Sequence, residues 1–132
     1  KHGAYVLVDC EGTPDVIIMA TGSEVQWAVA GAKTLAAEGI KARVLSMPSL
    51  EWFEEQDEEY KEAILPKSVK ARVSIEAGLA LPWYKYLGDC GKAVSIEQYG
   101  LQGDGGQNMI DLGITAEHVV EAAKASIEEA RA

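Results

Sequence analysis

The strongest constraint in this sequence is the alternation of short Val- and Ile-rich segments with longer segments of helical periodicity. The uninterrupted apolar run at residues 16–20 is typical of a strand that is covered on both faces. Such alternation predicts an α/β domain of three layers with a mostly parallel sheet. The expected strands are residues 15–21 (DVIIMAT), 42–47 (ARVLSM), 71–76 (ARVSIE), 93–97 (AVSIE) and, more weakly, 4–8 (AYVLV).

The segments between these strands predict helices. Residues 23–38 carry an apolar stripe, Ser23 and Gln26 have the spacing of a capping box, and Gly39 stands where a left-handed cap belongs. In the last helix Thr115 is the expected N-cap. The other expected helices are residues 50–65, 81–87 and 115–130.

Length and charge exclude several classes of protein. A chain of 132 residues with 48% apolar residues suits one globular domain over residues 1–132, and its longest apolar run is too short to cross a bilayer. The net charge of 12 − 21 = −9 disfavours nucleic-acid and membrane-surface partners. Cys10 and Cys90 are too few for a disulfide framework, which suits a reducing cytosol. Because the chain opens at Lys1 without Met or a signal pattern, we expect it to be part of a longer protein.

Six sequence blocks follow one another over nearly the whole chain in an order and spacing shared with a known family. They are residues 14–24 (PDVIIMATGSE), 39–48 (GIKARVLSMP), 53–66 (FEEQDEEYKEAILP), 71–78 (ARVSIEAG), 83–86 (WYKY) and 113–124 (GITAEHVVEAAK). In these blocks the chain resembles the C-terminal domain of transketolases, which are thiamine-diphosphate-dependent sugar-phosphate enzymes.

The resemblance implies a three-layer α/β/α sandwich on a five-stranded sheet whose first strand is antiparallel to the others. It also implies a cytoplasmic, homodimeric enzyme that transfers two-carbon ketol units between sugar phosphates in the pentose phosphate pathway. In the family, thiamine diphosphate, Mg²⁺ and the substrates are bound by domains that precede this segment. The resemblance therefore implies no catalytic, cofactor-binding or metal-binding residue in this chain. By itself the chain is expected to be inactive and to pack against the other domains and the dimer mate.

One segment departs from the family pattern. Family members usually have Phe-Gly-x-Ser and then a proline-containing stretch after the last strand, whereas residues 99–108 read YGLQGDGGQN. The segment also lacks the third glycine of a dinucleotide-binding fingerprint. We expect a flexible surface loop over residues 100–106.

The turn between the second strand and the first long helix is the one candidate anion site. Thr21, Gly22 and Ser23 follow a strand and open a helix, where backbone N–H groups can hold an anion or a regulatory nucleotide. The more ordinary interpretation, which we favour, is that Ser23 caps the helix.

Aromatic residues suggest an interface, because a domain taken from a larger enzyme exposes its former contacts. Trp27 adds to this expectation, since it lies off the apolar stripe of its helix. The candidate interface residues are Trp27, Trp52, Phe53, Trp83, Tyr84 and Tyr86. The alternative is ordinary packing in the core, which we expect for some of the last five.

The remaining polar residues favour structural roles. The acidic run over residues 51–62 is typical of a solvated helix face. Glu76 and Glu97 stand at the ends of expected strands without a catalytic partner, and His2 and His118 are expected on the surface.

Two alternatives remain open at this point. One is the matching domain of another thiamine enzyme, such as deoxyxylulose-phosphate synthase or the β subunit of a 2-oxo-acid dehydrogenase, which the SMP and WYKY blocks disfavour. The other is a free-standing regulatory domain that binds a nucleotide or phosphate at residues 21–24.

Overall fold

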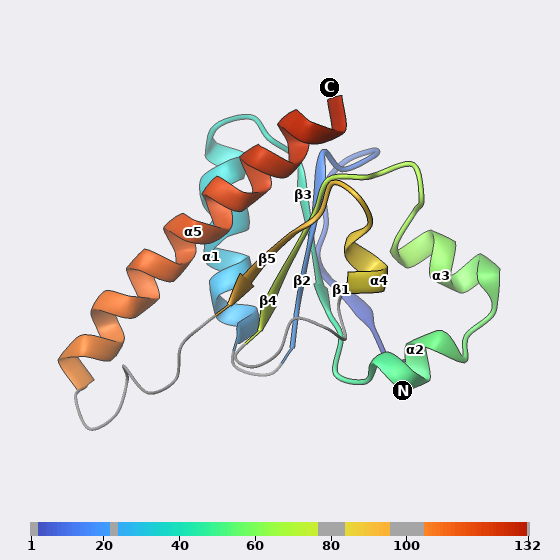
Figure 1. Cartoon of the computed structure of the whole chain (residues 1–132), viewed down its shortest axis with the longest axis horizontal. Helices are drawn as coiled ribbons and strands as arrows, with labels where there is room; N and C mark the ends of the chain where they lie inside the picture. The colour runs from blue at the N-terminus through green and yellow to red at the C-terminus, as the bar shows by residue number, and fades with distance from the viewer. Residues whose placement is uncertain (1–2, 22–23, 77–83, 96–104, 132) are drawn as a thin grey trace.

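The computed structural model describes residues 3–21, 24–76, 84–95 and 105–131. Ten helices and strands lie in these ranges, and strands and helices alternate as expected (Figure 1). They are β1 (Tyr5–Val8), β2 (Val16–Ala20), α1 (Val25–Ala37), β3 (Ala42–Ser46), α2 (Leu50–Glu54), α3 (Glu58–Ile64), β4 (Arg72–Glu76), α4 (Tyr84–Leu87), β5 (Lys92–Ser95) and α5 (Gly105–Arg131).

The five strands form one sheet in the order β1-β3-β2-β4-β5. β1 runs antiparallel to β3, and the other neighbouring pairs are parallel. α1 and α5 lie on one face of the sheet, and α2, α3 and α4 lie on the other (Figure 1). The expected three-layer α/β/α sandwich with an antiparallel first strand is confirmed.

β2 is the central strand of the sheet, and every one of its residues is apolar and fully buried. Its side chains alternate between two cores: Val16, Ile18 and Ala20 face α1 and α5, whereas Ile17 and Met19 face the α2–α4 layer. Each large aliphatic side chain contributes roughly 1.5–3 kcal/mol by leaving water. An apolar run without polar alternation therefore specifies a strand between two helix layers.

The end of α1 follows the sequence prediction. Gly39 adopts φ +83°, its N–H donates to the Ala36 carbonyl at 3.0 Å, and the Ile40 N–H donates to the Leu35 carbonyl at 2.9 Å. These two bonds form a Schellman motif, which satisfies carbonyls that the helix leaves unpaired. The chain can then turn directly into β3.

Residues 50–65 form two helices, so the prediction of one continuous helix is wrong. α2 ends at Glu54, and α3 begins at Glu58 after a break. Asp57 is extended, and its side chain accepts a hydrogen bond from the Tyr60 N–H at 2.8 Å. An acid at the N-cap, followed by two acids in the first turn, is a stronger local signal than the apolar spacing that runs across the break.

The prediction that the last helix begins at Thr115 is also wrong. α5 extends from Gly105 to Arg131, so Gly105 and Gly106 belong to a helix, while residues 100–104 of the expected surface loop lie outside the described residues. The prediction relied on the cap preference of Thr115 and on Glu117 in the first turn, where the helix dipole favours an acid. Each is worth only about 1 kcal/mol, which a cooperative helix overrides.

Candidate functional site

The edge of the sheet where β2 ends is the place where open α/β sheets bind ligands. Thr21 is half-buried there, and its carbonyl accepts a hydrogen bond from the Glu24 N–H at 3.2 Å. Glu24 is buried and occupies the N-cap position of α1 without a side-chain capping bond. Gly22 and Ser23 lie outside the described residues, so both the capping role of Ser23 and an anion site at this turn stay predictions.

The six candidate interface aromatics do not share one surface. Phe53 and Tyr86 are buried in the core under α2, α3 and α4. Their rings pack edge to face, with the ring centroids 5.9 Å apart. Trp52 is 53% exposed. Trp83 and the side chain of Tyr84 lie outside what the structure describes.

Trp27 is buried in the core on the α1 side, so the expectation that it lies off the buried face of its helix is wrong. α1 packs against both the sheet and α5. Its buried arc is therefore wider than a stripe facing the sheet alone. The buried residues of α1 are Trp27, Ala28, Gly31, Ala32 and Leu35.

Glu54 departs from the rest of the acidic run, which otherwise is mostly exposed. The Tyr86 hydroxyl donates to its carboxylate at 2.5 Å, and Lys85 Nζ lies 3.3 Å from the other oxygen. The Tyr86 hydrogen bond and the nearby lysines hold the pKa of Glu54 below its usual range, although partial burial opposes this. Burial, followed by the hydrogen bond to Glu54, raises the pKa of Tyr86. An ionised carboxylate held in this way ties α2 to α4 and is a poor proton acceptor at neutral pH.

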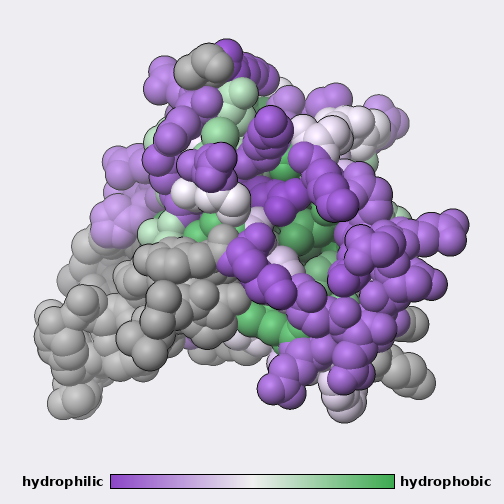
Figure 2. All heavy atoms as spheres, turned by 45° about the vertical axis from the view of Figure 1, so that its right-hand side comes forward, coloured by the Kyte–Doolittle hydropathy of each residue, from purple (hydrophilic) through white to green (hydrophobic). Residues whose placement is uncertain are grey.

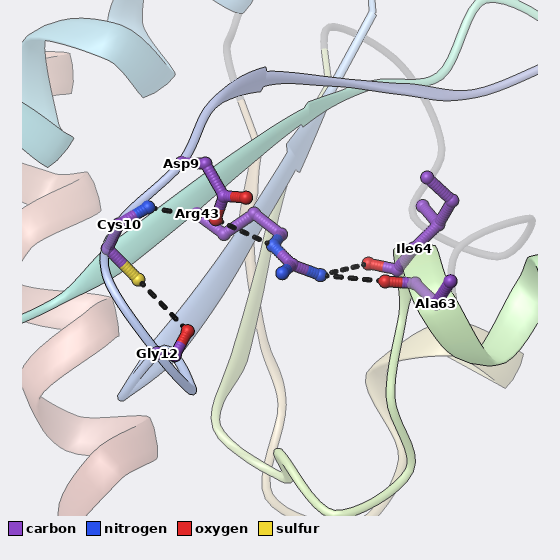
Figure 3. Close-up of polar contacts among 6 residues, drawn as sticks. All are labelled: Asp9, Cys10, Gly12, Arg43, Ala63 and Ile64. Carbon is purple, nitrogen blue, oxygen red and sulfur yellow. Dashed lines mark hydrogen bonds and ion pairs between the residues drawn. The ribbon is translucent and has the colours of Figure 1, made fainter.

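Arg43 connects three segments that are distant in sequence (Figure 3). Its Nε donates to Asp9 at 3.0 Å, and one Nη donates to the carbonyls of Ala63 and Ile64, each at 3.0 Å. The guanidinium thus occupies the carbonyl end of α3, where a cation is favourable.

The segment after β1 is held by the same arginine. The pKa of Asp9 is lower than its ordinary value. Partial burial alone would raise this pKa, but the hydrogen bonds from the Cys10 N–H and Arg43, together with the charge of Arg43, outweigh the effect of burial. Burial and the charge of Asp9 raise the pKa of the Cys10 thiol, so this cysteine is not an activated nucleophile.

Arg72 makes a second, more buried set of connections. Its guanidinium donates to the carbonyls of Val69 at 2.9 Å, Tyr86 at 2.7 Å and Pro66 at 2.8 Å. On the other face of the sheet, the Ser126 hydroxyl accepts from the Arg72 N–H at 2.9 Å and donates to the Cys90 carbonyl at 2.6 Å. Sequence reasoning missed both arginines. Their signal is the repeated Ala-Arg-Val at residues 42–44 and 71–73, which puts a cation inside each buried strand.

The remaining candidates add no chemistry within the described ranges. His118 is exposed on α5, and His2, Glu97 and the side chain of Glu76 lie outside the described residues. No group of three or more acidic, His or Cys side chains suited to a metal occurs among the residues that the structure describes. None of the helices in those same ranges is long and apolar enough to cross a membrane.

Most of the polar contacts described above connect one helix, strand or turn to another. Comparison with known proteins identifies the family. The family model of the transketolase-like C-terminal domain matches residues 3–115. A transketolase from Mycobacterium bovis is 50% identical over 96% of this chain, and the chain spans 19% of the length of that relative.

Solved structures give the same result. Transketolase from Pichia stipitis, in a complex with sedoheptulose-7-phosphate, superimposes with a TM-score of 0.82 at 34% sequence identity. The match covers 98% of this chain and 18% of the Pichia stipitis chain. A chain described as a split gene transketolase, inactive β4 tetramer, superimposes with a TM-score of 0.66 at 27% sequence identity. This match covers 97% of our chain and 42% of the split gene chain. These matches do not favour another thiamine enzyme or a free-standing regulatory domain. The chain belongs to the family of transketolase-like C-terminal domains.

Proposed function

We propose that this chain serves as the C-terminal domain of a cytoplasmic, dimeric transketolase and that its own contribution is architectural. The parent enzyme would transfer two-carbon ketol units between sugar phosphates, with thiamine diphosphate and Mg²⁺ held by its other domains. The observation that carries the proposal is the 50% identity to a curated transketolase over nearly the whole chain, at about a fifth of that enzyme's length. The sedoheptulose-7-phosphate named for the Pichia stipitis complex supports sugar phosphates as substrates of the parent.

The architectural part of the proposal is supported by how the described polar groups are used. Arg43, Arg72 and Ser126 are all engaged in connections between helices and strands, and the pKa of Glu54 is shifted away from that of a general base. A related chain of which this domain covers 42% carries the description of an inactive tetramer. That description agrees with a segment that needs other domains for activity.

The test measures ketol transfer, with thiamine diphosphate and Mg²⁺ present, for the 132-residue chain alone and for the longer polypeptide that contains it. We expect transfer by the longer polypeptide and no transfer by the chain alone above the rate without protein. Ketol transfer by the isolated chain would refute the architectural role. A longer polypeptide without ketol transfer would refute the transketolase assignment.

A further inference from the structure

A cavity of about 400 Å³ lies on the α1 side of the sheet, where the second half of α1, the start of β3 and the segment after β1 meet. Its volume falls within the range of roughly 300–1,000 Å³ that is typical of small-molecule sites. The face that carries α2, α3 and α4, on the other side of the sheet, is mostly hydrophilic, with apolar residues visible between the polar ones (Figure 2). The cavity beside α1 is therefore large enough for a small ligand.

Aliphatic side chains form most of the cavity wall. Val29, Ala32 and Ala36 are spaced by three and four residues, which places them on one side of α1. Val8 and Ile40 line the cavity from the strand layer and the turn before β3, and both also pack on the core under α1 and α5. The two alanines leave open a space that larger side chains would fill. An aliphatic space of this kind favours an alkyl group over a polar one.

Two lysines line the same cavity. Lys33 is exposed on α1, and Lys41 is exposed immediately before β3. Of the ion pairs among the described residues, none includes either lysine, although the chain has 21 acidic and 12 basic residues. Lysine stems can lie along apolar surface while the ammonium groups stay in water at its edge. The cavity therefore combines an apolar interior with two cations that have no intramolecular ion pair in the described part of the chain.

The acidic groups near the cavity are engaged in other contacts. Asp9 lines the cavity, but its carboxylate accepts from the Arg43 Nε at 3.0 Å and from the Cys10 N–H at 2.8 Å. Figure 3 shows Asp9 between Cys10 and the Arg43 guanidinium. Asp15 accepts from the backbone N–H of Lys41 at 2.8 Å. Neither of these carboxylates forms an ion pair with a lysine of the cavity.

We propose that this cavity, here called the lysine cavity, binds an alkyl monocarboxylate of medium chain length. The alkyl chain fills the aliphatic space between α1 and β3, and the carboxylate is bound by the ammonium groups of Lys33 and Lys41. A singly charged head fits better than a phosphate ester, because Asp9 stays charged in the wall and the Arg43 guanidinium is already bound. This binding site does not depend on the proposed function, since every residue that forms it belongs to this domain.

The test uses Cys10, which lines the lysine cavity, as a reporter of occupancy. Iodoacetamide is added to the 132-residue chain and to the longer polypeptide that contains it, with and without octanoate, and mass spectrometry follows each cysteine. At saturating octanoate we expect alkylation of Cys10 to slow by about fivefold or more, because the bound ligand excludes the reagent. Cys90 is half-buried and outside the lysine cavity, so as the matched reference it should keep its rate within about twofold.

A ligand series separates the apolar part of recognition from the charged part. The concentration that half-protects Cys10 should fall by about fourfold for each methylene added between butanoate and octanoate, because each methylene leaves water. Octanol, which keeps the alkyl chain and lacks the charge, should bind about tenfold more weakly than octanoate. The double variant Lys33→Gln, Lys41→Gln should lose the same factor for octanoate and keep the affinity for octanol.

A cavity-filling variant locates the ligand. Ala36 is exposed and lines the lysine cavity, so Ala36→Leu should abolish the protection of Cys10 by octanoate. Ala37 is its exposed neighbour outside the cavity, and Ala37→Leu is the matched control that should retain protection. Circular dichroism and the alkylation rate of Cys90 report whether each variant is folded.

Four results would overturn the inference. The first is no slowing of Cys10 by octanoate, or equal slowing of Cys10 and Cys90. The second is a half-protecting concentration that does not change with chain length or with the charge of Lys33 and Lys41. The third is full protection in a folded Ala36→Leu variant, which would place octanoate elsewhere. The fourth is a longer polypeptide in which Cys10 resists alkylation without octanoate, which would show that another part of that polypeptide covers the cavity.

Discussion

At the residue scale, single side chains decide how closely the layers approach. Gly31 lies in the middle of α1 at its contact with α5, where an added Cβ would be 2.7 Å from Val119 Cγ1. Val119 is β-branched and fully buried, so it cannot easily move away. A glycine that is unfavourable for helix propensity therefore permits the approach of two helices.

We predict that Gly31→Ala destabilises the domain by up to about 2 kcal/mol, because an overpacking cost of about 1–3 kcal/mol outweighs the gain of about 1 kcal/mol in helix propensity. Urea unfolding monitored by circular dichroism measures the change in the free energy of unfolding. In the double variant Gly31→Ala, Val119→Ala the clash is absent, so the effects of the two substitutions should not add. A stabilising Gly31→Ala would show that the two helices are farther apart than described.

The Glu54–Tyr86 pair predicts a dependence of stability on pH. The pKa of Glu54 is lower in the folded state than its ordinary value of 4.5, so its contribution is complete above that pH and is lost as pH falls through the folded pKa. Because the Glu54 side chain is 36% exposed, we expect Glu54→Gln to cost no more than about 1 kcal/mol at pH 7. The difference from the native chain should shrink as the pH falls below 4.5.

Urea titrations of the two proteins at a series of pH values measure this difference. Glu55→Gln, at the exposed neighbour of Glu54, is the matched control and should stay within about 0.5 kcal/mol of the native chain at each pH. A Glu54→Gln difference that is constant with pH would mean that the carboxylate charge contributes nothing to the connection between α2 and α4.

At the element scale, the helix boundaries depend on caps as much as on apolar spacing. The role of Gly39 as the left-handed cap of α1 could be predicted because such a cap depends on local sequence. The break at Asp57 was missed because Phe53, Tyr60 and Ile64 keep helical spacing across it and share one core. The early start of α5 was missed for the opposite reason, since the local cap preference of Thr115 suggested a boundary that the helix does not have.

Asp57→Ala distinguishes two helices from one. With Asp57 as the N-cap of α3, loss of its bond to the Tyr60 N–H costs about 0.5–2 kcal/mol. In one continuous helix the same change would stabilise the chain, because Ala has the higher helix propensity. Thermal unfolding gives the sign, and Asp57→Asn, which retains the cap, should lie close to the native chain.

At the scale of the whole molecule, the sequence alone predicted the layers, the sheet and the family, because a buried β2 and the family blocks are encoded in contiguous residues. It did not predict the connections made by Arg43 and Arg72, because the carbonyls that they bind come from other turns and helices and meet only in the folded chain. Trp27 was misplaced for a similar reason, since the packing of α1 against both α5 and the sheet arises only in the folded chain. The candidate anion turn at Thr21 stays a prediction.

We propose that this domain acts by packing on the rest of a transketolase. The most direct measurement adds the purified 132-residue chain to the longer polypeptide truncated before Lys1 and follows ketol transfer. We predict that the truncated protein alone has little activity and that added chain restores it in a saturable manner. Full activity of the truncated protein without the chain would contradict the claim.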